Sequence, residues 1–287
     1  MKIRELFDKK TIFSLEVFPP KKTSSVDVIY KTLEELGDIH PDFISVTFGA
    51  GGSGNRGTRH LRGISEIGEN GIIPMLHLPC INFTKEEIDS ALDEAKSRGI
   101  VNILALRGDI NPDITPIKQF SHASDLIPYI KTRGDFDVAG ACYPEGHPDS
   151  ETLDEDIENL RKKVDSGADH LITQLFFDND YFYNFRDKAV KAGINVPIEA
   201  GIMPVVNKNQ IERMVTTCGA SLPHKFVKIM QKYGQNPEAM RDAGIAYAIN
   251  QIVDLAASDV DGIHLYSMNN AYVARKISES VSGVLGE

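Results

Sequence analysis

Tryptophan is absent from the 287 residues, and cysteine occurs only three times, at Cys80, Cys142 and Cys218. An odd and sparse set of cysteines predicts no disulfide framework and fits a reducing compartment. Positive charge is also scarce: 31 Lys and Arg face 41 Asp and Glu, which gives a net charge of −10. A chain of this charge argues against nucleic acid as a partner, because it offers no excess of cations to follow a phosphate backbone.

Long apolar runs are missing as well. None approaches the roughly 18–20 residues that a membrane-spanning helix needs. The opening residues, MKIRELFDKKTIFSLEVF, lack the continuous apolar core and the small-residue cleavage site of a signal peptide. We therefore expect a cytoplasmic protein without membrane contact. No low-complexity tract or Pro/Gly/Ser-rich linker marks a boundary, so residues 1–287 are predicted to be a single domain.

The chain does contain eight short runs of β-branched and aromatic residues, which is the composition of strands. They lie at 11–17, 43–48, 72–78, 101–107, 136–143, 170–177, 196–202 and 262–268. Helical patterns separate them; Thr84 and Glu87, for example, have the spacing of a capping box before a helix that ends at Gly99. Strands that alternate with helices predict parallel βα units.

Eight similar units favour a closed (β/α)8 TIM barrel over an open doubly wound sheet, which the pattern also permits. No GxGxxG turn follows the first predicted strand, and the glycine-rich segment 49–57 lacks the lysine of a phosphate-binding loop. The long interval before the last strand predicts extra helices, including one within 236–258. Whether these helices serve function or are a neutral insertion stays open.

Polar residues gather where the predicted strands end. The carboxyl ends of barrel strands carry the active sites of such enzymes. Glu16 stands out because it lies inside an apolar run, and an outward position is disfavoured in a sheet covered on both faces. An inward carboxyl group there can act as a general acid. For Asp109 a salt-bridged loop, for His77 a core position and for Gln174 a backbone-satisfying role stay open.

A metal site is the less favoured interpretation of the soft side chains. The chain has no Cys-x2-Cys pair, and its Cys-to-His spacings match no common zinc motif. Cys80 and Cys142 can equally be small core residues. We therefore predict no metal.

Seven strings occur in a fixed order: SLEVFPPK, SVTFGAGGS, HLPC, ALRGD, ACYPEGHP, DIENLRKKVDSGADHLITQLFFD and PIEAGIMPV. Together they resemble the flavin-dependent 5,10-methylenetetrahydrofolate reductases, over about residues 12–270. The resemblance implies a (β/α)8 barrel of the single-domain bacterial type that holds FAD across its carboxyl-end face. It also implies reduction of 5,10-methylenetetrahydrofolate to 5-methyltetrahydrofolate, with hydride passing from NAD(P)H through the flavin in a ping-pong sequence.

The resemblance also assigns roles to single residues. Glu16 takes the place of the general acid that protonates N10 of the folate, and Asp109 that of a carboxylate beside the flavin. Gln174 takes the place of a folate-contacting amide. The implied FAD contacts are Thr47, Phe48, His77, Arg107, Gly108, Asp109, Tyr143, His147, Asp156 and Lys163.

Three positions depart from the family pattern. Phe48 replaces a common tyrosine, Met214 falls where an aromatic residue can cover substrate and nicotinamide, and Asn270 falls where an arginine can contact substrate. We still expect Met214 and Asn270 in the substrate-binding set. No basic cluster that would read a 2′-phosphate is apparent, which favours NADH over NADPH. A metal- or corrinoid-dependent folate methyltransferase, an FAD-binding subunit reduced by a partner protein, and a homo-oligomer stay open.

Overall fold

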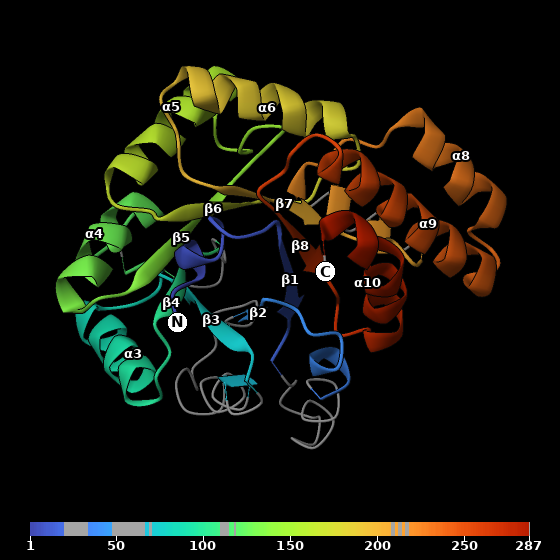
Figure 1. Cartoon of the computed structure of the whole chain (residues 1–287). Coiled ribbons are helices and arrows are strands. Elements are labelled where there is room, and N and C mark those ends of the chain that lie inside the picture. Colours follow the sequence, from blue (N-terminus) through green and yellow to red (C-terminus); the bar gives the residue numbers. More distant parts are fainter. Residues whose placement is uncertain are drawn as a thin grey trace.

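Eight parallel strands pair in chain order, and β1 pairs with β8, so that the sheet closes into a barrel (Figure 1). The computed structural model describes residues 1–19, 34–47, 67–68, 71–109, 115–117, 119–207, 210–211, 214–215 and 218–286. The strands are β1 (Ile12–Val17), β2 (Phe43–Val46), β3 (Ile73–Pro79), β4 (Asn102–Leu106), β5 (Asp137–Cys142), β6 (His170–Thr173), β7 (Ile198–Ile202) and β8 (Gly262–Tyr266). The predicted (β/α)8 barrel is confirmed.

Helices surround this barrel on the outside (Figure 1). They are α3 (Lys85–Ser97), α4 (Ala123–Arg133), α5 (Leu153–Asp165), α6 (Asn179–Lys191), α8 (His224–Tyr233), α9 (Pro237–Ala256) and α10 (Ala271–Leu285). The short 3-10 helix η1 (Ile3–Glu5) lies apart from them, at the amino ends of the strands. The predicted capping box is present, since Thr84 Oγ1 accepts from the Glu87 N–H and the Glu87 carboxylate accepts from the Thr84 N–H. Two helices, α8 and α9, lie between β7 and β8, which confirms the extra helices.

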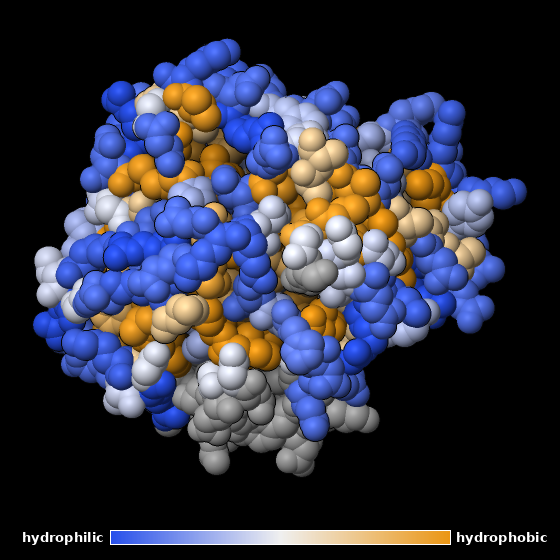
Figure 2. Space-filling model, viewed as in Figure 1, coloured by the Kyte–Doolittle hydropathy of each residue, from blue (hydrophilic) through white to orange (hydrophobic). Residues whose placement is uncertain are grey.

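The strands are buried almost throughout, because helices cover one face of the sheet and the barrel interior covers the other. Outward residues and helix faces form the main apolar core, which includes Cys80 and Cys142. A second cluster fills the barrel interior toward the amino ends of the strands, with Ile12, Phe43 and Met75 among its members. Figure 2 shows the resulting surface, on which hydrophilic residues cover most of the outer helices.

The N-terminal segment packs against the amino ends of the strands. The Ile3 N–H donates to Asn102 Oδ1 at 3.0 Å, and the Arg4 N–H donates to Asp137 Oδ2 at 2.9 Å. The Phe7 ring lies 5.3 Å from the buried His170 ring. This segment therefore covers the amino ends of β4 to β6, at the opposite end of the barrel from the predicted site.

One predicted strand is too long. The regular strand in the run at 170–177 ends at Thr173. The Gln174 N–H still donates to the Cys142 carbonyl oxygen of β5 at 2.7 Å, but the Leu175 N–H donates to the Gln174 side-chain oxygen at 2.9 Å. The chain then leaves the sheet, and Phe177 stacks on Phe226 of α8 with ring centroids 5.1 Å apart. The extra helices thus cover apolar residues that follow β6 and β7.

Candidate functional site

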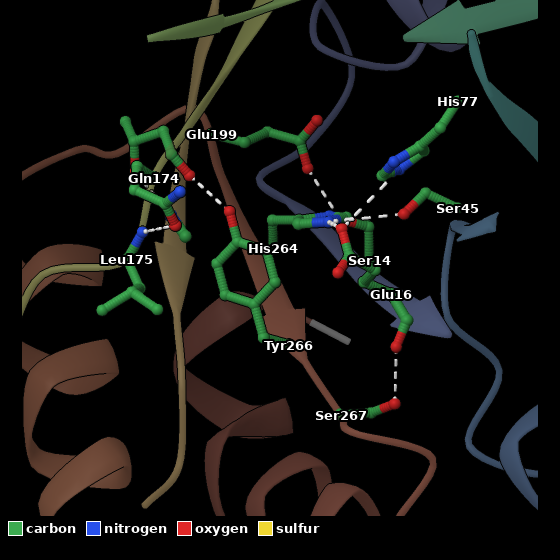
Figure 3. A network of polar contacts seen from close by, with 12 residues as sticks. Ser14, Glu16, Ser45, His77, Gln174, Leu175, Glu199, His264, Tyr266 and Ser267 are labelled. Atoms are coloured by element: carbon green, nitrogen blue, oxygen red, sulfur yellow. Dashed lines mark hydrogen bonds and ion pairs between the residues drawn. The ribbon is translucent and has the colours of Figure 1, made fainter. Parts of the chain in front are cut away.

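Glu16 is the central residue of the site. Side chains alternate along β1, so that Ser14 and Glu16 both point into the barrel, beside His264 and Tyr266 of β8 (Figure 3). Glu16 is next to the carboxyl end of its strand, and its side chain keeps 12% exposure. The inward position predicted for Glu16 is confirmed.

Two imidazoles flank the Glu16 carboxyl group. Glu16 Oε2 lies 3.6 Å from His77 Nε2 and 3.8 Å from His264 Nε2. Burial lowers the pKa of His77 to about 4 even though the charge of Glu16 acts to raise it. At neutral pH the His77 ring is therefore uncharged, and Glu16 has no cationic partner on that side.

Two buried polar atoms near this carboxyl group have no hydrogen-bond partner within the described part of the chain. They are Thr47 Oγ1, just after β2, and His77 Nε2. Buried polar atoms in native proteins are nearly always satisfied, so an unsatisfied pair at a strand-end face points to a bound polar group. Both residues belong to the FAD contacts that the family resemblance implies.

The loop after β4 carries the next part of the site. The Arg107 guanidinium pairs with Asp149 at 2.5 Å, an acidic partner that the sequence did not single out. Gly108 has a φ of +90°, and a Cβ there would lie 3.0 Å from Pro79 Cβ, so the turn requires glycine. Asp109 is exposed and forms no ion pair with any described residue.

The loop after β5 and helix α5 form an adjoining polar wall. The Tyr143 and His147 rings meet edge to face at 4.6 Å. Burial raises the pKa of Tyr143 to about 12 and lowers that of His147. Lys163 reaches back from α5 to the Ala141 carbonyl oxygen, and burial lowers its pKa although Asp156 acts to raise it. The wall therefore contains a half-buried ammonium group beside a buried carboxyl group.

Met214 and Asn270, both expected in the substrate-binding set, lie close together in the structure. They line one pocket of about 410 Å³, whose other lining residues are Pro204, Val206, Asn207, Gln210, Ser267, Met268 and Val273. Asn270 also caps α10, because its side-chain oxygen accepts from the Val273 N–H. Gln174 does not line this pocket. Phe48 lies outside the described residues.

Sequence reasoning missed the polar side chains deeper in the barrel. Ser14, Glu199, His170 and His264 are fully buried there. Glu199 carried the same signal that identified Glu16, a carboxyl group inside an apolar strand run, and could have been found by it. Ser267 was also missed; its hydroxyl donates to the Glu16 carbonyl oxygen at 2.6 Å and joins β8 to β1.

The described residues contain neither a metal-binding cluster nor a membrane-spanning helix. No three His, Cys, Asp or Glu side chains among them lie together as a bound metal ion would need. None of their helices combines the length and apolar character required to cross a bilayer.

The known proteins similar in sequence to this chain share one description, methylenetetrahydrofolate reductase. The family model described as methylenetetrahydrofolate reductase matches residues 2–282. The chain is 33% identical over 270 residues to the 5,10-methylenetetrahydrofolate reductase of Escherichia coli, covering 93% of this chain and 90% of that one. It is 36% identical over 293 residues to methylenetetrahydrofolate reductase (NADH) 1 of Arabidopsis thaliana, covering 96% of this chain and 48% of that longer protein.

Among solved structures, an uncharacterized protein from Clostridium thermocellum that binds two copies of 5-methyl-5,6,7,8-tetrahydrofolic acid has a similar fold. The TM-score is 0.71 at 14% identity, with 99% of this chain and all of that chain covered. At this identity the likeness concerns the fold alone.

A parallel eight-stranded barrel with titratable side chains at its carboxyl-end face is the architecture of the α/β-barrel enzymes. Within that class, this chain belongs to the methylenetetrahydrofolate reductase family, because the family model spans nearly all of it. The protein is accordingly an oxidoreductase.

Proposed function

We propose that the protein reduces 5,10-methylenetetrahydrofolate to 5-methyltetrahydrofolate with FAD, in a ping-pong sequence that takes its hydride from NAD(P)H. The observation that carries the proposal is the Glu16 carboxyl group, inward and partly exposed beside the neutral His77 ring. Family membership supplies the substrate class, and the E. coli relative carries the same activity in its name.

The folate step needs an acid. The methylene bridge accepts hydride only after the five-membered ring opens to an iminium ion, and protonation of N10 drives that opening. Glu16 gives this proton, and Asp109, in the loop after β4, stabilises the positive charge that develops. Met214 and Asn270 hold the substrate in their shared pocket, and Gln174 contacts it from the end of β6.

The side chains at the carboxyl-end face suit FAD. Thr47 Oγ1 and His77 Nε2 are buried polar atoms without a hydrogen-bond partner among the described residues, and they can bond the cofactor. Arg107 and Lys163 supply positive charge for the diphosphate in an otherwise acidic protein. Gly108, Tyr143, His147 and Asp156 complete the described part of this cradle. When bound, FAD supplies the hydride that reduces the folate.

The absorption spectrum of the purified protein is the first test. We expect the visible bands of an oxidised flavin, and a colourless protein that transfers a methyl group would overturn the proposal in favour of a methyltransferase. The same sample should form 5-methyltetrahydrofolate when NADH and 5,10-methylenetetrahydrofolate are added. A yellow protein that needs a second protein for this reaction would instead be a subunit reduced by a partner.

Two adjacent lysines of α5 allow a matched test of the FAD site. Lys163 is half-buried against the barrel, whereas Lys162 is exposed. We expect Lys163→Met to lower FAD occupancy on purification and Lys162→Met to leave it unchanged. Equal occupancy in the two variants would remove Lys163 from the cradle.

A further inference from the structure

Glu199 places a carboxyl group in the closed interior of the barrel, below Glu16. It is fully buried on β7, and its Oε2 lies 2.8 Å from Ser14 Oγ. Its Oε1 has no hydrogen-bond partner among the described residues and faces His170 Nε2 at 3.9 Å. Burial lowers the pKa of His170 to about 3, so the ring is neutral and offers Glu199 no compensating charge.

A line of polar atoms joins this carboxyl group to the site above it (Figure 3). Ser14 Oγ, which bonds Glu199, also lies 2.7 Å from His264 Nδ1. The other nitrogen of that ring, Nε2, lies 3.8 Å from Glu16 Oε2 and 3.5 Å from Ser45 Oγ. The histidine thus has one ring nitrogen toward the interior carboxyl group and the other toward the acid.

The protonation state of Glu199 decides the direction of these hydrogen bonds, because a serine hydroxyl has a single proton to donate. A protonated Glu199 donates to Ser14 Oγ, and Ser14 then donates to His264 Nδ1. His264 therefore carries its own proton on Nε2, toward Glu16. An ionised Glu199 accepts from Ser14 instead, so that His264 donates from Nδ1 and turns an Nε2 lone pair toward Glu16.

We propose that Glu199 is a positioning residue for the Glu16 acid: through Ser14 it sets which nitrogen of His264 carries the proton, and hence whether an N–H or a lone pair faces the Glu16 carboxyl group. Ionisation of Glu199 releases one proton to solvent, while the proton of His264 moves from Nε2 to Nδ1 and no other is gained or lost. The lone-pair form favours a protonated Glu16, which is the form able to donate. The consequence of the His264 tautomer for catalysis rests on the proposed function, in which Glu16 is the acid.

The surroundings of Glu199 hold its proton near neutral pH. Burial raises the pKa of Glu199 to about 8; the hydrogen bond with Ser14 acts to lower it, and the negative charges of Asp42 and Asp261 act to raise it. The groups that face His264 are Ser14 and Glu16 of β1, Phe43 and Ser45 of β2, His77 of β3, His170 of β6 and Tyr266 of β8. The two other histidines in this set have lowered pKa values, so neither brings a positive charge at pH 7.

The first test reads the tautomer of His264 from the nitrogen NMR shifts of ring-labelled protein, between about pH 6 and pH 10. The His264 signals are assigned by their loss in His264→Asn. In the wild type we expect the proton to move from Nε2 to Nδ1 near pH 8. Glu199→Gln and Ser14→Ala should each abolish this transition, because one cannot ionise and the other breaks the link.

The control is Ser278→Ala, which removes a buried hydroxyl from α10, outside the barrel interior. It should keep the transition. A wild type without the transition, or a transition that persists in both Glu199→Gln and Ser14→Ala, would overturn the proposal. If Glu199→Gln does not fold, Ser14→Ala decides alone, since it leaves the carboxyl group in place.

The second test follows single turnovers of the folate half-reaction. In the wild type we expect the rate to change about tenfold across the same pH interval, and both variants should lose this inflection. Flavin reduction by NADH should keep its pH profile in all of them. If no folate is reduced, the proposed function fails while the NMR transition stands. If folate is reduced and the transition is missing, only the role of Glu199 fails.

Discussion

Glu16 and His77 meet with 3.6 Å between Glu16 Oε2 and His77 Nε2, where a carboxyl group faces an uncharged imidazole. Desolvation of His77 outweighs the attraction of the carboxylate, so the pair is no salt bridge at neutral pH. A carboxylate without a cationic partner loses no ion-pair stabilisation when it binds a proton, and that suits a general acid.

Glu16→Gln should block the folate half-reaction and leave flavin reduction by NADH largely intact. The amide keeps the shape of the side chain but has no acidic proton, and loss of a general acid costs about a hundredfold or more in rate. Stopped-flow traces of the two half-reactions separate the effects. Equal loss in both would make Glu16 a structural residue.

Asp109→Asn should slow hydride transfer to folate and raise the reduction potential of the bound flavin. Removal of a negative charge favours the electron-rich reduced flavin. Asp109 is exposed, so water weakens the effect to about 1 kcal/mol, or on the order of 20 mV for a two-electron couple. Potentiometric titration measures it, and a potential that falls or does not move would place Asp109 away from the flavin.

The isolated protein should accept electrons from NADH directly. Met214 lies in the pocket with Asn270. Under the proposed function the nicotinamide binds there, and an aromatic ring would stack on it with about 0.5–1.5 kcal/mol beyond area burial. The thioether recovers part of that stacking through sulfur–aromatic contact. Met214→Phe should therefore lower the NADH concentration for half-maximal reduction. Anaerobic mixing decides the donor: flavin bleaching that requires a second protein would contradict the NADH assignment.

Gly244→Ala should destabilise the fold. A Cβ on Gly244 of α9 would lie 1.9 Å from the Val205 carbonyl oxygen, a backbone atom that no side-chain rotation can move away. The helix would have to move away, at a cost of about 3 kcal/mol or more in the free energy of unfolding. Gly283→Ala is the control, because its Cβ meets nothing within 4 Å in α10 and should stabilise by about 0.5–1 kcal/mol. Urea denaturation of both variants checks the pair.

Acid should destabilise the protein below pH 6.5 through its buried histidines. The pKa of His77 is about 4 and that of His170 about 3, both lowered by burial. Below pH 6.5 an unfolded imidazole binds a proton that the folded one does not, so stability falls with pH at about 1.4 kcal/mol per unit for each ring.

His170→Phe should remove one of these two contributions, and urea denaturation at several pH values measures the slope. The exposed His224 is the matched control, since His224→Phe changes no buried imidazole. A His170→Phe slope equal to that of the wild type would show that His170 is protonated in the folded state.

The sequence alone determined the elements and much of the site. Eight strand-like runs alternate with helical patterns, and parallel strands must carry their carboxyl ends on one face, so Glu16, His77 and Arg107 could be placed together before any coordinates. The end of β6 could not be predicted, because Leu175 and Phe177 have strand composition and leave the sheet only to pack beneath α8 and α9.

Only the tertiary structure decided which polar residues touch. The line from Glu199 through Ser14 to His264 joins residues as far apart as 250 positions, and it exists because barrel closure pairs β1 with β8. The Arg107–Asp149 pair and the neutral state of His77 likewise depend on neighbours and burial that no local pattern records. Local propensity fixes which segments become strands and helices, whereas contacts, burial and hence charge states arise when distant segments are brought into one interior.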